Sequence, residues 1–273
     1  MRAASSRVLL VLLVLVVSWA GLVHAGAAGL VETWPLEELE EPSGVVYHPA
    51  RGTLFVVSDE GGVYEVSSSG QILASQRLGG DLEGVTCDPS TGLIYVVREG
   101  HEVIFEIEPE GLTTKRRFTI DRAFGGNEDF LQRGGDGIEG ITFVPTDGHP
   151  EGGRFFAVNQ NDPAVLVELD IPIRSSSERF ASARVIKAIK VGSAPLSGIA
   201  WDATSRRLLI VSALWRVAYL VDIEGVYKGS LALPGIMQEG ITRLPGGAFI
   251  IAQDSGGLIR WTPVEKLTGT AGD

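Results

Sequence analysis

A short phrase occurs five times along this chain: a serine or glutamate, then glycine, then a branched apolar residue. The copies begin at Ser43-Gly44-Val45, Glu83-Gly84-Val85, Glu139-Gly140-Ile141, Ser197-Gly198-Ile199 and Glu239-Gly240-Ile241. Their starts are 40, 56, 58 and 42 residues apart. Such spacings are typical of four-stranded propeller blades, two of them lengthened by insertions. The first residue of each copy is called the repeat starter below.

Each copy continues with the same order of strand-like segments. Continuous apolar runs, typical of strands buried on both faces, follow at residues 54–57, 93–96, 155–158, 208–211 and 249–252. A third segment comes next at residues 63–66, 103–107, 165–169, 218–221 and 258–261. More polar fourth segments lie at 72–78, 114–120, 185–191 and 227–233, and the fifth copy has none. Four of the five units therefore predict four strands each.

The strand absent from the fifth unit has a candidate upstream of the first. Residues Leu30 to Leu36 form a short strand-like run with no blade of its own. Paired beside residues 258–261, this run would complete the last blade and remove an exposed sheet edge. The sequence thus predicts an all-β fold, a five-bladed β-propeller with the N-terminal strand closing the last blade, as a single domain over residues 26–273. A six-bladed ring is the rival, and it needs a further copy within the insertions.

The N-terminal segment predicts export. Arg2 and Arg7 make the start of the chain positively charged, and an unbroken apolar run follows from Val8 to Val17. Ala25 supplies the small residue of a cleavage site. We expect a secretory signal peptide over residues 1–25 and an extracytoplasmic protein, periplasmic or secreted. The alternative is an uncleaved anchor with membrane contact, because no charged residue occurs from Val8 to Val31.

Strand direction brings two sets of residues to one face of the ring. In an up-and-down blade the first strand starts where the second strand ends. The turns between first and second strands belong to the opposite face, and we exclude them from the predicted site. Trp215 follows a second strand, where it can floor a binding cleft or pack at the rim. The site-face candidates are Ser43, Asp59, Glu60, Glu99, Asn159, Ser197, Ser212, Trp215, Gln253 and Asp254.

Three repeat starters, Glu83, Glu139 and Glu239, are the candidate metal ligands. Glutamates brought together at one axis raise one another's pKa, and a bound cation removes that conflict. The chain has one cysteine and four histidines, so the available ligands are mostly oxygen atoms, which suit Ca²⁺ better than Zn²⁺. The alternative is that each glutamate only starts a strand and accepts backbone hydrogen bonds.

These phrases also resemble a known family. They are similar to the SdiA-regulated propellers, also called YjiK/CarP-like. The similar segments are residues 82–86 with 92–99, then 138–141 leading to 159–161, and finally 238–241. The resemblance covers nearly all of the chain after residue 25. It implies an exported or envelope-associated β-propeller, linked in part of the family to calcium, without an assigned reaction. The family's glutamates carry over to Glu83, Glu139 and Glu239, whereas Ser43 and Ser197 are neutral.

Three functions remain open at this point. The first is a non-enzymatic, calcium-binding module that presents its site face to a ligand or an envelope protein. The second is a metal-dependent esterase or lactonase with an axial Ca²⁺, for which Glu99 or Asp254 would act as the base. The third is a structural envelope protein. The formal charge of −11 argues against a nucleic acid partner, and we expect a monomer.

Overall fold

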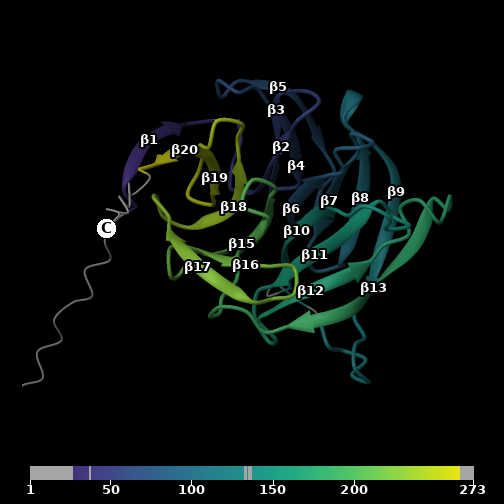
Figure 1. Cartoon of the computed structure of the whole chain (residues 1–273). Helices are drawn as coiled ribbons and strands as arrows, with labels where there is room; N and C mark the ends of the chain where they lie inside the picture. The colour runs from purple at the N-terminus through teal and green to yellow at the C-terminus, as the bar shows by residue number, and fades with distance from the viewer. Residues whose placement is uncertain (1–26, 37, 132–133, 135–136, 265–273) are drawn as a thin grey trace, which may run out of the picture.

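The chain folds almost entirely into β-strands. The computed structural model describes residues 27–36, 38–131, 134 and 137–264, so the predicted signal peptide lies outside the described residues. In this part of the chain, the strands form three four-stranded sheets and one eight-stranded sheet around a common centre (Figure 1). Among the described residues, the one helical segment is a single 3₁₀ turn, η1 (Glu110–Leu112). No helix among the described residues is both long enough and apolar enough to span a membrane.

The first sheet shows the basic unit, an antiparallel meander whose first strand is innermost. Its strands are β2 (Pro42–His48), β3 (Thr53–Ser58), β4 (Gly62–Val66) and β5 (Ile72–Arg77), paired in that order. The inner strands are buried and β5 is largely exposed. This gradient matches the predicted change from continuous apolar runs to polar outer strands.

The eight-stranded sheet contains two such meanders. The first has β6 (Leu82–Cys87), β7 (Ile94–Arg98), β8 (Val103–Glu108) and β9 (Thr113–Asp121). The second has β10 (Ile138–Pro145), β11 (Gly153–Asn159), β12 (Val165–Asp170) and β13 (Phe180–Ile189). They join because residues 180–184 of β13 pair in parallel with residues 117–121 of β9. The predicted strand 185–191 therefore begins five residues earlier and has two partners.

The remaining two sheets complete the ring. One contains β14 (Gly198–Asp202), β15 (Arg207–Ser212), β16 (Val217–Val221) and β17 (Tyr227–Ala232). The other contains β18 (Gln238–Arg243), β19 (Phe249–Gln253), β20 (Leu258–Pro263) and β1 (Gly29–Trp34). Strand β1 pairs antiparallel with β20, from Gly29 opposite Pro263 to Trp34 opposite Leu258. The predicted closing strand is confirmed.

The hydrophobic core lies between neighbouring sheets. The inner strands β2, β6, β10, β14 and β18 contact one another in cyclic order, with β18 returning to β2. Between the first and last sheets, buried Val45 and Leu54 pack with Ile250 and Leu258. The inner strands of each sheet are thus buried on both faces, which explains the continuous apolar runs and fixes all inner strands around one axis.

Candidate metal centre on the acidic face

The glycines of the five repeats bring the inner strands into backbone contact. A Cβ atom added to Gly44, Gly84, Gly140, Gly198 or Gly240 would lie 2.2 to 3.0 Å from a backbone atom of the next inner strand. No other residue type fits at such distances. The prediction that these glycines serve close backbone approach is confirmed. Each glycine therefore holds the residue before it at the same end of the axis.

Three of those preceding residues are glutamates, and the structure brings their carboxylates together. One carboxylate oxygen from each of Glu83, Glu139 and Glu239 lies within 4.8 Å of the others. Glu83 and Glu139 are buried and Glu239 is half-buried. Glu83 and Glu139 also line a small cavity of about 10 Å³ among the axial glycines. The repeat starters with acidic side chains thus converge at one mouth of the axis, as the sequence predicts.

Burial and mutual repulsion keep these glutamates from ionising together. Burial, then the charges of Glu99 and Glu239, raises the pKa of Glu139 to about 10. Burial, then the charge of Asp254, raises the pKa of Glu239 to about 8. Burial, followed by the charge of Glu139, also raises the pKa of Glu83 well above its usual range. At neutral pH, protons occupy this cluster unless a cation displaces them.

A second carboxylate group shares Glu83 with the first. Oxygens of Asp81, Glu83 and Glu99 also lie within 4.8 Å of one another. The Oε1 atom of Glu99 accepts a hydrogen bond from the backbone N–H of Gly137 at 2.6 Å. Burial and the nearby Asp81 charge raise the pKa of Glu99 despite that bond. One oxygen of Asp81, Oδ1, is buried and has no hydrogen-bond partner in the described part of the chain.

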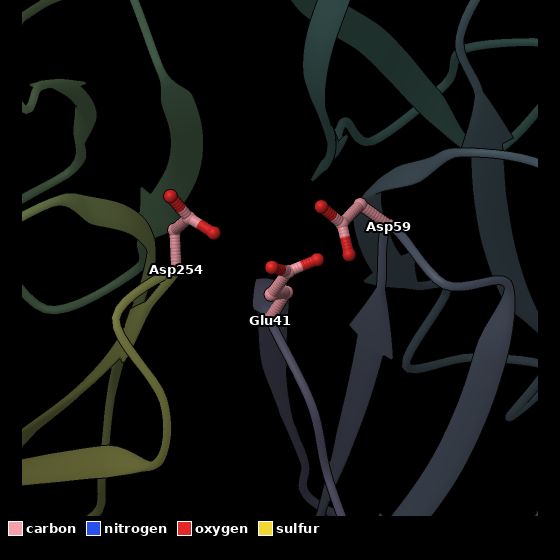
Figure 2. Close-up of side chains that lie close together, drawn as sticks. All are labelled: Glu41, Asp59 and Asp254. Carbon is pink, nitrogen blue, oxygen red and sulfur yellow. The ribbon is translucent and has the colours of Figure 1, made fainter.

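A third group lies where the first and last sheets meet. Figure 2 shows the side chains of Glu41, Asp59 and Asp254 directed toward one another, and their nearest oxygens lie within 4.8 Å. Burial, then the charge of Glu41, raises the pKa of Asp59 to about 7. The Oδ1 atom of Asp59 is buried without a hydrogen-bond partner among the described residues. Of these three, the sequence prediction includes Asp59 and Asp254 but misses Glu41.

Glu41 and Asp81 occupy the same position, two residues before a repeat starter. The carbonyl of Glu41 accepts the backbone N–H of Asp59 at 3.3 Å, and the carbonyl of Asp81 accepts that of Glu99 at 2.9 Å. This recurring bond brings an acidic residue before the first strand beside an acidic residue after the second. The repeat phrase begins at the starter, two positions after Glu41 and Asp81, and therefore does not include this pairing.

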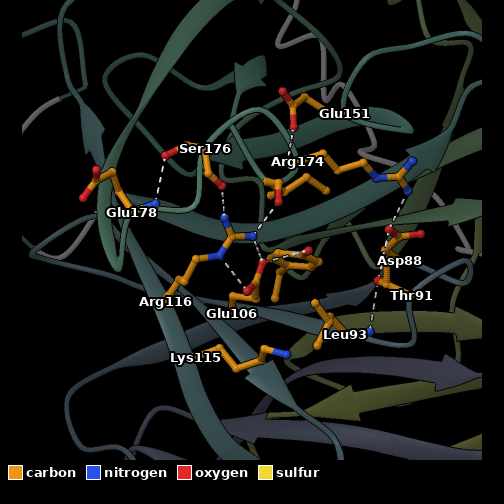
Figure 3. Close-up of polar contacts among 12 residues, drawn as sticks. Asp88, Thr91, Leu93, Glu106, Lys115, Arg116, Glu151, Arg174, Ser176 and Glu178 are labelled. Atoms are coloured by element: carbon orange, nitrogen blue, oxygen red, sulfur yellow. Dashed lines mark hydrogen bonds and ion pairs between the residues drawn. The ribbon is translucent and has the colours of Figure 1, made fainter.

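Most buried carboxylates elsewhere in the described part of the chain have an arginine partner, and Glu151 instead accepts the backbone N–H groups of Arg174 and Ser175. Figure 3 shows two of these pairs, Glu106 with Arg116 and Asp88 with Arg174, the latter at 3.0 Å. Glu65 is a further case: burial alone would raise its pKa, but the hydrogen bonds and charge of Arg51 hold the pKa below its usual range. Among the described residues, none of the eight carboxylates in the three groups forms an ion pair with arginine, lysine or histidine. We call the face that carries these three groups the acidic face. In the described part of the chain, its carboxylates lack the cationic partner that most other buried carboxylates have.

Comparison with known proteins identifies the family. Residues 29–255 match the SdiA-regulated family. The chain belongs to the SdiA-regulated family. No curated protein matches this SdiA-regulated chain.

Solved structures show the propeller-like fold. A glutaminyl cyclase from Myxococcus xanthus has a TM-score of 0.60 at 13% identity, with 86% of this chain and 97% of that chain covered. A protein of unknown function from Bacteroides caccae has a TM-score of 0.49 at 12% identity, covering 77% and 69% of the two chains. At such identities, only the first likeness supports the fold, and neither supports an activity.

The neutral site-face candidates of this SdiA-regulated chain mostly bind nearby backbone. Their hydrogen bonds shape the loops around the carboxylates rather than leaving free side chains. The bonds run from Ser43 Oγ to Glu41 O, from Ser197 Oγ to Gln238 O, from Ser212 Oγ to Pro195 O, from Asn159 Nδ2 to Asn161 O and Pro163 O, and from Ile236 N to Gln253 Oε1.

Two further candidates lie outside the three carboxylate groups. Glu60 is exposed and lies 3.6 Å from a guanidinium nitrogen of Arg77. Trp215 is 45% exposed, and its indole N–H donates to the carbonyl of Ala194 at 3.3 Å. Neither side chain belongs to any of the three carboxylate groups, so neither is part of the candidate metal centre.

Proposed function

We propose that this SdiA-regulated protein is an exported, calcium-binding propeller that acts as a ligand- or partner-binding module. Glu83, Glu139 and Glu239 would be the ligands of the ion. The observation that carries the proposal is the contrast in partners: most buried carboxylates elsewhere pair with arginine, and those on the acidic face have no such partner among the described residues. Unpaired buried charges are costly, and a divalent cation removes that cost.

The geometry of the three glutamates suits a common ion. Ca²⁺ binds oxygen at about 2.3–2.6 Å, so two of its ligand oxygens lie no more than roughly 5 Å apart. One carboxylate oxygen of each of these glutamates lies within 4.8 Å of the others, which is compatible with that range. The buried, unpartnered Oδ1 atoms of Asp59 and Asp81 offer further acceptors on the same face. These groups contain only carboxylate oxygens, whereas Zn²⁺ favours nitrogen and sulfur.

The architecture proposed for the module is a ring of five blades. Strands β6–β9 and β10–β13 each repeat the order of the four-stranded sheets, and five inner strands contact one another in a cycle. On this interpretation, the parallel contact between β9 and β13 joins the outer edges of two neighbouring blades. The apolar N-terminal segment supports export, because it has the pattern of a signal peptide.

The surroundings of the acidic face favour binding over catalysis. Leu214, Trp215, Ile236 and Met237 are large apolar residues, and all are exposed. Met237 is beside the acidic cluster, because its carbonyl accepts the backbone N–H of Asp254 at 3.1 Å. Exposed apolar side chains of this kind mark contact surfaces for ligands or partner proteins. Calcium would neutralise the centre and leave this apolar border to contact the partner.

Melting curves of the metal-stripped protein test this proposal. Ca²⁺ at about 100 times its dissociation constant should stabilise the protein by roughly 2.7 kcal/mol, with smaller effects of Mg²⁺ and Zn²⁺. Glu139→Gln should bind Ca²⁺ more weakly and show a much smaller shift, and Glu60→Gln, on the same face but outside the cluster, should retain the full shift. Equal calcium shifts in both variants would contradict the proposed ligands. Calcium-dependent turnover of aryl esters or lactones that is lost in Glu99→Gln would instead support the hydrolase.

A further inference from the structure

A mainly apolar cavity lies at the end of the axis opposite the carboxylates. Its volume is about 320 Å³, and its wall includes residues from β2, β6, β10, β14 and β18 and from the turns that follow them. Val45, Val85 and Ile199 line both this cavity and the small one beside Glu83 and Glu139. These three apolar residues therefore separate the acidic mouth from the second cavity. We call the larger cavity the axial pocket.

The wall of the axial pocket is mainly apolar. Aromatic side chains stand at the fourth position after three of the repeat starters, and proline stands at the sixth position after four of them. These residues include Tyr47, Phe143 and Trp201, with Pro49, Pro89, Pro145 and Pro245. A volume near 300 Å³ with apolar walls is at the small end of the range for ligand pockets.

Three threonine hydroxyls give the pocket its polar contacts. Thr86, Thr142 and Thr242 stand three residues after the acidic repeat starters, and all line the pocket. Their Oγ1 atoms accept backbone N–H groups of the next inner strand at 2.9, 2.9 and 3.1 Å. No acceptor in the described part of the chain receives a hydrogen bond from these hydroxyls. Each hydroxyl therefore retains its proton for an acceptor on a ligand.

The charges in the wall compensate each other. Arg243 and Asp202 line the pocket, and a guanidinium nitrogen of Arg243 lies 2.9 Å from the Oδ2 atom of Asp202. Asp202 also accepts a hydrogen bond from Ser205, at 2.6 Å. An anionic ligand would meet the negative charge of Asp202 beside Arg243, and a cationic ligand would meet the positive charge of Arg243 beside Asp202. The wall thus favours an uncharged ligand over an ionised one.

We propose that the axial pocket binds a small, uncharged, mainly apolar molecule with a carbonyl or ether oxygen that accepts hydrogen bonds from the threonine hydroxyls. The apolar wall contributes desolvation, and the hydroxyls orient the acceptor oxygen. The pocket lies on the face that the sequence excluded from the predicted site. Its occupancy does not depend on calcium at the opposite mouth, so failure of the proposed function would leave this inference standing.

Prodan, an uncharged naphthalene ketone with solvent-sensitive emission, is a suitable probe. Titrated into the full chain, it should show saturable binding with blue-shifted emission, while the similar-sized anion 1-anilinonaphthalene-8-sulfonate should bind more weakly. Ala203→Trp would fill the pocket from an exposed position of its rim. Its matched control is Ala213→Trp, because Ala213 directly follows β15 on the acidic face. The N-terminal apolar segment is identical in all variants, so binding to it would not differ between them.

The expected result is loss of about tenfold or more in prodan affinity for Ala203→Trp, with Ala213→Trp unchanged. Thr142→Val removes one hydroxyl while keeping a similar shape, and should weaken prodan binding and shift its emission further to the blue. Equal affinities in the two tryptophan variants would overturn the site. Tighter binding of the anion than of prodan, lost in Ala203→Trp, would overturn the ligand class. Melting curves verify that each variant is folded.

Discussion

Replacing Glu139 by glutamine should make the calcium-free protein more stable at neutral pH. Glu139 is 5% exposed and lies within hydrogen-bonding reach of Glu99. In the wild type it must either keep a proton or place a second charge beside Glu99 and Glu239. A glutamine amide can donate to Glu99 as the protonated carboxyl does, but it never ionises. The substitution therefore removes the repulsion and retains the hydrogen bond.

The magnitude follows from the pKa difference between the folded and unfolded chains. The pKa of Glu139 is about 10 when folded, against 4.5 for an unperturbed glutamate. Because the folded pKa is raised, the folded state binds the extra proton, and stability is lost as pH rises from the unfolded toward the folded pKa. Each pH unit in that window costs about 1.4 kcal/mol. Between about pH 5 and pH 7, the wild type should lose roughly 3 kcal/mol through this group alone.

Urea unfolding of calcium-free protein across this pH range measures the effect. The slope of unfolding free energy against pH should be shallower in Glu139→Gln than in wild type by about 1.4 kcal/mol per pH unit. Glu60→Gln is the matched control, and as an exposed site it should change stability by less than about 0.5 kcal/mol at either pH. Parallel slopes for wild type and Glu139→Gln would refute the assignment of a raised pKa to this buried carboxyl.

Two further predictions concern the ring itself. Deleting residues 29–34 exposes the edge of β20 and should lower the melting temperature by about 2–4 °C for each kcal/mol lost, and an unchanged melting temperature would show that β1 does not close the ring. Gly140→Ala places a Cβ atom 2.9 Å from the backbone nitrogen of Ile199 and should cost about 3 kcal/mol, measured by urea unfolding. Gly52→Ala, which meets no atom within 4 Å but has a φ of +69°, should cost only about 1–2 kcal/mol, and an equal loss in both variants would count against the close axial contact.

The parts of the structure that repeat were predictable from the sequence. The recurring phrase placed the inner strands, because each copy needs a glycine where backbones meet. It also brought Glu83, Glu139 and Glu239 to one mouth of the axis. The missing outer strand identified β1 as the partner of β20, since a ring with an open edge leaves backbone groups unpaired.

Features that depend on contacts between units were not predictable in the same way. Residues 180–184 of β13 pair with β9, a long-range parallel contact without a local pattern. Charged residues were the sequence signal for a site, and they do not indicate the axial pocket, because the pocket is built mainly from apolar side chains and hydroxyls. The hydroxyl of Thr142 illustrates the difficulty, because its oxygen accepts a hydrogen bond from the backbone N–H of Trp201, which belongs to a neighbouring sheet.

Calorimetric titration of Ca²⁺ in two buffers of different ionisation heat tests the metal centre most directly. Coordination requires ionised carboxylates, and the raised pKa values of Glu139, about 10, and Glu239, about 8, mean that both hold protons near neutral pH. The wild type should therefore release roughly one to two protons for each Ca²⁺ bound at about pH 7, and the heat should depend on the buffer. Glu139→Gln should bind more weakly and release fewer protons. Calcium binding with a heat that is the same in both buffers, or no binding, would contradict a calcium site built from these glutamates.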